Sequence, residues 1–421
     1  MSLINSNNTV AVIGAGAAGL LAAVTAARSG AHVILIERTS DGGRKILISG
    51  GGRCNILPST AQPHRYVTDS SPHTLRKILR SWPLHEQRAF FEHELSMRLE
   101  LEAETGKLFP ASNRARDVRD MLLTRTREAG AEIWFEASVV GLRRDKGHWE
   151  IELDSAPALT AASVVLATGG LSVPKTGSDG TGLSIAKALG HKEHATYPAL
   201  TPLTADPHPH ANLAGISLTV SINAPGSRPA FSTQDGFLVT HDGWSGPAIL
   251  DASHLAIRGK KDGSRQELTM QWAQANANVW DQTLQDENGT VRSTISSVLP
   301  RRLTDQLLSE ANVDGGTPLS QLRKADRKAV VNALSHYPIP WTGDAGYKKA
   351  EVTGGGIALS EIHPATMESI RCPGLYLCGE ILDAFGPIGG HNFLWAWATG
   401  RSAGKYAAVR LGDAPSKSQS G

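Results

Sequence analysis

The sequence predicts a mixed α/β fold, and three consecutive features near its start carry that prediction. A short apolar run over residues 9–13 stops at Gly14 and indicates a buried strand. The Ala-rich stretch over residues 17–28 has the composition of a helix. A second apolar run, residues 32–36, ends on Glu37. A strand, a glycine turn, a helix and a strand that ends on an acid are the order of a Rossmann-like nucleotide-binding unit.

Each glycine of this turn has a separate expected role. Gly14 allows the tight turn, Gly16 lets a pyrophosphate approach the backbone, and Gly19 lets the helix pack close to the sheet. The helix N-terminus offers free N–H groups and the positive end of its dipole to the phosphates. Glu37 lies where a carboxylate can accept both hydroxyls of an adenosine ribose. Together these features predict a dinucleotide site and not a structural turn.

Residues 42–55 indicate which dinucleotide is bound. Three successive glycines, residues 50–52, have too much conformational freedom for a helix or a packed strand and suit a loop that lies against a ligand. Arg44, Lys45 and Arg53 place positive charge around this loop. FAD is longer than NAD, and its ribityl and flavin ends need such a second cradle. We therefore expect FAD; the alternative is a solvated basic loop.

The stretch from Gly43 to Asn55 resembles the G-x-K-x-x-x-S-G-G-G-R-C-N motif of the aminoacetone oxidase-like, BaiN-like FAD flavoproteins. Blocks at 167–170, 351–356 and 374–392 are also similar, so the resemblance runs from about residue 9 to about residue 408. The chain departs from the family pattern at His391, where the family often has Tyr, and after Asn392, where the family often has Leu-Gln. The resemblance implies a glutathione-reductase-type FAD-binding fold and an oxidoreductase activity.

Patterning along the chain predicts that inserted domains interrupt the FAD-binding domain. Prolines punctuate residues 198–209, alternating segments at 217–222 and 236–240 indicate strands, and a helical pattern follows residue 291. We expect a first part of the FAD-binding domain over 1–195, a β-rich insert over 196–290 and a small helical insert over 291–345. The second part of the FAD-binding domain is expected over 346–411, and a disordered tail over 412–421.

The expected cofactor contacts lie in the glycine turn, the 43–55 loop, three strand ends and the C-terminal return. They are Gly14, Gly16, Ala17, Ala18, Gly19, Glu37, Arg38, Gly43, Arg44, Lys45, Ser49, Gly50, Gly51, Gly52, Arg53, Cys54, Asn55, Val139, Ala167, Thr168, Gly169, Gly170, Gly379, Glu380, Asp383, Gly390, Asn392 and Phe393. The helix expected over 392–411 would point its N-terminus at the flavin and favour the anionic reduced ring. Gly400 and Gly404 leave one face of that helix bare for tight packing.

The expected function is FAD-dependent oxidation or reduction of a small organic substrate, either an amine or an enone. His391 is the candidate for proton transfer; the alternative is a residue that only hydrogen-bonds nearby. Cys54 is expected to be a packed thiol, and Trp395 and Trp397 are expected to pack. An RNA-acting flavoprotein and a flavin-binding redox sensor without turnover are the alternative functions. Histidines show no metal-ligand spacing, so no metal is expected.

Composition restricts the partners and the compartment. The net charge of +2 and the absence of a Lys/Arg block predict no nucleic-acid partner. Three scattered cysteines and the lack of a signal-peptide pattern predict a cytoplasmic protein, and no apolar run predicts a membrane span. No second dinucleotide fingerprint follows a strand, so NAD(P)H is expected at most as a transient electron donor. The oligomeric state is left open.

Overall fold

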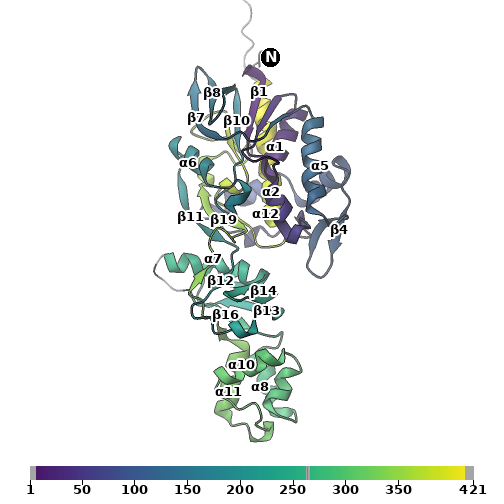
Figure 1. Ribbon diagram of the computed structural model, residues 1–421, viewed down its shortest axis with the longest axis vertical. Coiled ribbons are helices and arrows are strands. Elements are labelled where there is room, and N and C mark those ends of the chain that lie inside the picture. Colours follow the sequence, from purple (N-terminus) through teal and green to yellow (C-terminus); the bar gives the residue numbers. More distant parts are fainter. Residues whose placement is uncertain (1–5, 262, 264–265, 413–421) are drawn as a thin grey trace, which may run out of the picture. The chain divides into compact units, whose positions relative to one another are not determined.

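The computed structural model describes residues 6–261, 263 and 266–412, and the chain divides into two compact units (Figure 1). The first unit combines Met1–Tyr197 with Val352–Gly421, and the second is Pro198–Glu351. The predicted α/β class is confirmed. The tail expected to be disordered, residues 412–421, lies outside the described residues except for Gly412. No helix in the described part of the chain is long and apolar enough to cross a membrane.

A parallel sheet forms the centre of the first unit, with strand order β20-β10-β1-β2-β6. Its strands are β1 (Thr9–Ile13), β2 (His32–Ile36), β6 (Glu132–Trp134), β10 (Ser163–Leu166) and β20 (Leu375–Leu377). Every residue of β1 and β10 is buried, as expected where a parallel sheet is covered on both faces. Because β20 comes from the C-terminal segment, two distant parts of the sequence complete one sheet.

The helices α1 (Ala17–Arg28) and α12 (His391–Gly412) pack against each other through glycine. A side chain at Gly400 would overlap the carbonyl of Ala18, and one at Gly404 would overlap the carbonyl of Ala22. The bare helix face predicted from the sequence therefore meets α1. This packing fixes the start of α12 relative to the glycine turn at the start of α1.

The other elements of the first unit surround this centre (Figure 1). The helices are α2 (Arg44–Ile48), α3 (Pro72–Arg80), α4 (Leu84–Ala89), α5 (Ala115–Glu128) and α6 (Thr181–Ala188). Antiparallel sheets are built by β3 (Leu57–Pro58), β5 (Lys107–Pro110) and β4 (Leu99–Glu102), and by β7 (Val139–Asp145), β8 (His148–Leu153) and β9 (Leu159–Ala161). β11 (Glu193–Ala199) pairs with β19 (Val352–Ile357). Short helical turns are η1 (Ser6–Asn8), η2 (Ser49–Gly52), η3 (Pro63–Arg65), η4 (Phe90–Glu94), η5 (Pro174–Thr176), η8 (Leu359–Glu361) and η9 (Gly379–Ile381).

The second unit combines an antiparallel sheet with helices on one hydrophobic core. In sheet order its strands are β17 (Tyr337–Pro338), β16 (Thr269–Gln271), β13 (Ser217–Ala224), β14 (Phe231–Val239), β15 (Gly243–Ser245), β12 (Leu203–Thr204) and β18 (Gly343–Asp344). Its helices are α7 (Pro247–Lys261), α8 (Ala277–Asp286), α9 (Val291–Ser296), α10 (Arg301–Glu310) and α11 (Lys324–Ser335), with short turns η6 (Ala211–Leu213) and η7 (Leu319–Gln321). The segments expected as a β-rich and a helical insert thus share a core, in which buried Trp272 and Leu303 both take part.

Candidate cofactor-binding site

The glycine turn between β1 and α1 has the geometry that the sequence predicts. Gly14 has φ of 100°, and a Cβ there would lie 2.7 Å from the carbonyl oxygen of Ala167. A Cβ at Gly19 would overlap the carbonyl of Gly14. Gly16 has an ordinary φ of −80°, and a Cβ there would meet no atom within 4 Å. Two glycines are therefore required by the fold, while the third leaves open space at the N-terminus of α1, where a pyrophosphate fits.

Glu37 lies beside this turn with its carboxylate buried. The Ala15 backbone N–H donates to Oε2 at 2.7 Å, and the Thr39 N–H and hydroxyl donate to Oε1 at 2.8 and 2.7 Å. The acid is thus held at the end of β2, next to the N-terminus of α1. A carboxylate in this place is suited to the ribose of an adenosine.

The triple glycine of the 42–55 motif forms a tight turn. Gly50, Gly51 and Gly52 have φ of 55°, 67° and 86°, a left-handed conformation that favours glycine. They lie in the short turn η2 and not in an extended loop, because successive residues in the left-handed conformation turn the backbone back on itself. A Cβ at Gly51 would meet no atom within 4 Å. The turn therefore exposes backbone, as the sequence predicts, with open space beside Gly51.

Most cations of this region are neutralised by neighbouring acids. Arg44 Nε lies 2.6 Å from Asp41 Oδ1. Arg53 lies 3.0 Å from Glu102 and 4.1 Å from the centre of the Phe109 ring. Arg38 pairs with Asp179. These arginines, expected to contact the cofactor, thus have protein partners.

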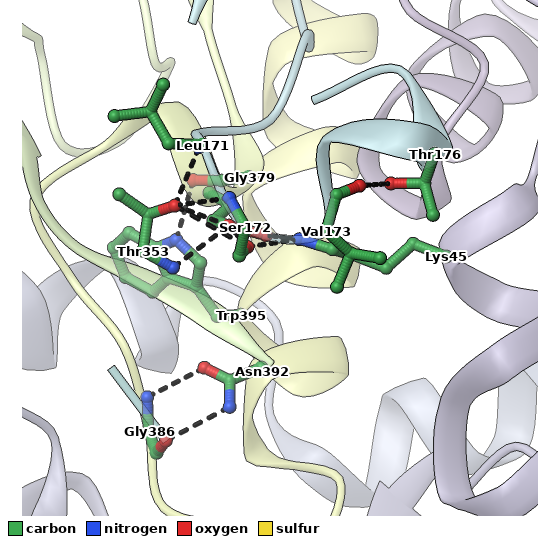
Figure 2. Close-up of polar contacts among 11 residues, drawn as sticks. Lys45, Leu171, Ser172, Val173, Thr176, Thr353, Gly379, Gly386, Asn392 and Trp395 are labelled. Carbon is green, nitrogen blue, oxygen red and sulfur yellow. Dashed lines mark hydrogen bonds and ion pairs between the residues drawn. The ribbon is translucent and has the colours of Figure 1, made fainter. Parts of the chain in front are cut away.

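Lys45 enters a polar network that sequence reasoning did not find (Figure 2). Its ammonium donates to Glu380 Oε2 and to Ser172 Oγ, both at 2.6 Å. The Thr353 hydroxyl donates to Glu380 Oε1 at 2.9 Å and accepts from the backbone N–H groups of Leu171 and Ser172. The network joins α2, the segment after β10, β19 and η9. Lys45 and Glu380, predicted separately as cofactor contacts, are brought together as an ion pair.

The backbone after this network is strained. Val173 has φ of 49°, a left-handed conformation that a β-branched residue rarely adopts. Its carbonyl accepts a hydrogen bond from the Thr176 hydroxyl at 2.8 Å (Figure 2). Such strain persists only where surrounding contacts impose it, and it is common at functional sites. Val173 follows Ser172 directly, so the network fixes the start of the strained segment.

Asp383 is buried and holds the chain that precedes α3. Its Oδ2 accepts from the Thr68 hydroxyl at 2.9 Å, from the Asp69 N–H at 3.0 Å, and from the Ser70 N–H and hydroxyl at 2.8 and 2.7 Å. Burial raises the pKa of this carboxyl, while the hydrogen bonds from Ser70 and Thr68 oppose the shift. The side chain expected to contact the cofactor is therefore engaged with residues 68–70.

Two buried polar atoms without partners lie where the 43–55 motif meets the start of α12. Among the described residues nothing bonds His391 Nδ1 or Asn55 Oδ1, although both side chains are buried. A Cβ at Gly390 would lie 2.9 Å from Asn55 Oδ1, so the two segments meet here. Buried polar groups normally have partners, and such orphaned atoms suit a ligand. They support the fit of a flavin at this place, as does the orphaned Thr168 Oγ1 beyond β10.

Two neighbours fix His391 and set its ionisation. The Tyr66 hydroxyl donates to the His391 carbonyl at 2.7 Å, and the two rings meet edge to face at 5.8 Å. Burial lowers the pKa of His391 to about 4, and the charge of Arg65 contributes. The imidazole is therefore neutral at neutral pH. Asn392 is engaged with the backbone, because its side chain makes a pair of hydrogen bonds with Gly386 at 2.9 and 3.0 Å (Figure 2).

The remaining predicted residues lie after β10 and β20, on α1 and β7, and on either side of α2. A Cβ at Gly169 would lie 2.5 Å from Ser178 Oγ, one at Gly170 would overlap the Thr353 side chain, and one at Gly379 would lie 2.9 Å from the Ala18 Cβ. These glycines therefore make room for protein atoms. Ala167, Val139 and Ala18 are buried, Ala17 is half-buried at the first position of α1, Gly43 precedes α2 with φ of 61°, and Ser49 bonds the Ile46 carbonyl.

The side chains expected to pack, those of Cys54, Trp395 and Trp397, are buried. Burial raises the pKa of the Cys54 thiol to about 12, so it is inert at neutral pH. Trp395 and Trp397 are buried, and their indole N–H groups donate to the carbonyls of Gly379 and Ile56. Phe393 stacks on Trp397 at 5.3 Å. In the described part of the chain no cluster of His, Cys, Asp and Glu could hold a metal ion.

Comparison with known proteins agrees with these motifs. Residues 8–406 match the model of the HI0933-like protein Rossmann domain. A 3-dehydro-bile acid delta(4,6)-reductase of Clostridium scindens is 30% identical over 412 residues, which cover 96% of this chain and 100% of the relative. A ribosomal RNA dihydrouridine synthase of Escherichia coli is 30% identical over 404 residues, which cover 92% of this chain and 95% of the relative.

A solved flavocytochrome c3 fumarate reductase shares the fold, with a TM-score of 0.50 and 16% identity over 97% of this chain and 79% of that chain. The family expected from the 43–55 motif and the enzyme class expected with it are confirmed. The chain belongs to the HI0933-like family of FAD-dependent oxidoreductases.

Proposed function

We propose that the chain is an FAD-dependent reductase that saturates a carbon–carbon double bond conjugated to a carbonyl group. The observation that carries the proposal is the chemistry common to the names of two relatives matched over nearly their full length. A bile-acid delta(4,6)-reductase and a dihydrouridine synthase act on unlike molecules, yet both names describe the addition of two hydrogens across a carbon–carbon double bond. Enone reduction is therefore supported over amine oxidation.

The residues at the site fit the cofactor that this chemistry needs. The open space at Gly16 would receive the pyrophosphate, Glu37 the adenosine ribose, and the orphaned Asn55 the flavin end. FAD, when bound and reduced, would supply the hydride, and the proton that completes the addition would come from solvent. The chain's own task is to hold the substrate against the cofactor and to polarise its carbonyl oxygen.

His391 is suited to that second task. Its imidazole is buried, packs edge to face against Tyr66 and has no partner at Nδ1 in the described part of the chain. With a pKa lowered to about 4 by burial, it is a poor proton donor at neutral pH. A neutral imidazole can still donate one hydrogen bond, which would polarise a carbonyl oxygen and favour hydride addition at the far carbon. This supports hydrogen bonding over proton transfer as the role of His391.

The test is an anaerobic oxidative half-reaction. The purified flavoprotein is reduced chemically and mixed with a steroid 4,6-dien-3-one, with uridine or with a simple cyclic enone. We expect the absorbance of oxidised flavin to return together with one equivalent of a product in which one carbon–carbon double bond has been reduced. If these compounds leave the flavin reduced, and an amine instead reduces the oxidised protein, the proposal is overturned in favour of amine oxidation.

A further inference from the structure

We propose that the exposed face of α3 binds the sugar–phosphate backbone of an RNA substrate. The inference rests on the proposed function, because it names the substrate class that carries the double bond. A uracil base within RNA contains a carbon–carbon double bond conjugated to a carbonyl group. The near-neutral net charge of +2 led us to expect no nucleic-acid partner. A net charge does not report how cations are distributed over the surface, and those of α3 lie together.

The basic residues of α3 form a stripe. They follow helical spacing along one exposed face and are His73, Arg76, Lys77 and Arg80. The opposite face is apolar and buried through Leu75, Ile78 and Leu79. Residues three and four apart on a helix are neighbours, so the stripe is continuous over roughly 10 Å. Cations distributed over that length suit a polyanion better than a single phosphate group.

No acid of the described residues forms an ion pair with Arg76, Lys77 or Arg80, whereas Arg38, Arg44 and Arg53 of the cofactor region are paired. The acids of the neighbouring C-terminal segment also have partners, since Glu368 pairs with Arg410 and Glu361 with Arg371. The positive potential of the stripe is therefore left uncompensated. Such a field attracts and steers a polyanionic partner.

The stripe also lines a groove of about 350 Å³. Pro364 and Ala365 form its other wall. A groove with cations along one wall and apolar atoms on the other fits a sugar–phosphate chain, which presents charge and apolar sugar atoms side by side. A lipid surface fits less well, because membrane-surface helices insert an apolar face and that of α3 is buried within the protein.

The position of α3 is fixed relative to the candidate cofactor site. Ser70, two residues before the helix, donates hydrogen bonds to the Asp383 carboxylate, and the Tyr66 hydroxyl donates one to the His391 carbonyl. At the other end of α3, Ser81 Oγ lies 3.5 Å from Ser402 Oγ of α12. An RNA backbone on the stripe would therefore be held at a set distance from the start of α12. The E. coli relative named as a ribosomal RNA dihydrouridine synthase supports RNA as the polyanion.

The test compares two variants with equal loss of charge. The first replaces Arg76, Lys77 and Arg80 with Gln. The matched control replaces Arg116, Arg127 and Lys146 with Gln, which are exposed cations of the same unit without an ion pair among the described residues. Both should retain FAD and the unfolding temperature of the parent. Binding of a labelled, uridine-containing single-stranded RNA is measured at several salt concentrations.

We expect the α3 variant to bind this RNA about 100-fold more weakly at about 0.1 M salt, with a salt dependence shallower by about 2 in log–log slope, as three lost phosphate contacts require. The control should bind like the parent. Equal binding by both variants, or no binding of RNA by the parent, would overturn the inference. Stripe-dependent binding to anionic phospholipid vesicles without binding to RNA would overturn it as well.

The two proposals fail separately. RNA binding is measured without turnover, and reduction of a cyclic enone by the parent protein is measured without RNA. A parent protein that reduces the enone but ignores RNA keeps the proposed function and loses this inference. One that binds RNA through the stripe but reduces neither the enone nor uridine keeps the inference and loses the proposed function.

Discussion

Replacing Gly16 with Ala should separate cofactor binding from folding. Gly16 has φ of −80° and ψ of −172°, which alanine adopts freely, and an added Cβ would meet no protein atom within 4 Å. Glycine is a better N-cap than alanine by about 0.5–1 kcal/mol, but alanine also reduces the entropy of the unfolded chain by about 0.4–1 kcal/mol. The two effects nearly cancel, so the apoprotein should keep its stability within about 1 kcal/mol.

The same methyl group should be costly for FAD. It occupies the space through which the pyrophosphate approaches the N–H groups of α1. Loss of two charge-assisted hydrogen bonds, at about 1.5–3 kcal/mol each, weakens binding by about 3–6 kcal/mol. Since each 1.4 kcal/mol is about tenfold, the dissociation constant should rise by a factor of about 10² to 10⁴.

The assay pairs urea unfolding of the flavin-free protein with FAD titration by quenching of flavin fluorescence. Gly19→Ala is the matched control, because its methyl group would overlap the Gly14 carbonyl. That variant should lose about 1–3 kcal/mol of unfolding free energy through overpacking. A Gly16→Ala protein that binds FAD with the affinity of the parent would refute the placement of the phosphates at this turn.

Three further predictions follow from the site. Glu37→Gln should lower the unfolding free energy of the apoprotein by about 1.5–3 kcal/mol and should weaken FAD binding. The reason is that an amide cannot accept hydrogen bonds from the Ala15 N–H and from both donors of Thr39. Urea unfolding that is unchanged from the parent would contradict this prediction. The pKa of His391 is lowered to about 4 in the folded protein, against 6.5 when unfolded, so its contribution to stability is full above about pH 6.5 and is lost as the pH falls toward 4. The variant His391→Asn should therefore flatten the dependence of the unfolding free energy on pH between these values. A variant with the same pH profile as the parent would contradict this prediction. Reduction of the bound flavin by NADPH should be slow, and a substrate analogue should compete with NADPH, because within the described residues only β1, α1 and β2 form a parallel unit with a glycine fingerprint. Fast, saturable flavin reduction in stopped flow that the analogue leaves unchanged would reveal a separate nicotinamide site.

The cofactor domain was predictable because its signals are local. The roles of Gly14, Gly16 and Gly19 depend on one turn, and the residues that decide them lie within one strand and one helix. The packing face of α12 was predictable for the same reason, since Gly400 and Gly404 are one turn apart. Start and stop signals of this kind can be read from a single sequence.

The polar network could not be predicted in this way. Lys45 and Glu380 are 335 residues apart, and Ser172 and Thr353 come from two further segments. Their meeting depends on the order of strands in the sheet, which no local pattern encodes. The left-handed Val173 has no sequence signal either, since the residues that favour this conformation are glycine and asparagine.

The second unit shows another limit. The helix α7 begins at Pro247, directly after Gly246, and a proline at the first position of a helix is a common helix start. The alternating pattern of the neighbouring strands led to a β-rich prediction for this segment. A boundary between a β-rich and a helical insert was expected near residue 290. In the structure, buried His210 bonds Glu310 of α10 at 3.1 Å and Tyr337 of β17 at 3.1 Å. Such a bridge between helix and sheet depends on three-dimensional packing that periodicity does not reveal.

Three unsatisfied buried atoms around the candidate cofactor site connect cofactor binding to stability. Asn55 Oδ1, His391 Nδ1 and Thr168 Oγ1 are buried without partners in the described structure, and each such group costs about 1–3 kcal/mol. They lie on three segments: the glycine motif, the start of α12 and the end of β10. A ligand that bonds them removes that cost and links these segments to each other. We therefore expect FAD to stabilise the first unit, so that loss of the cofactor loosens the segments that would hold the substrate.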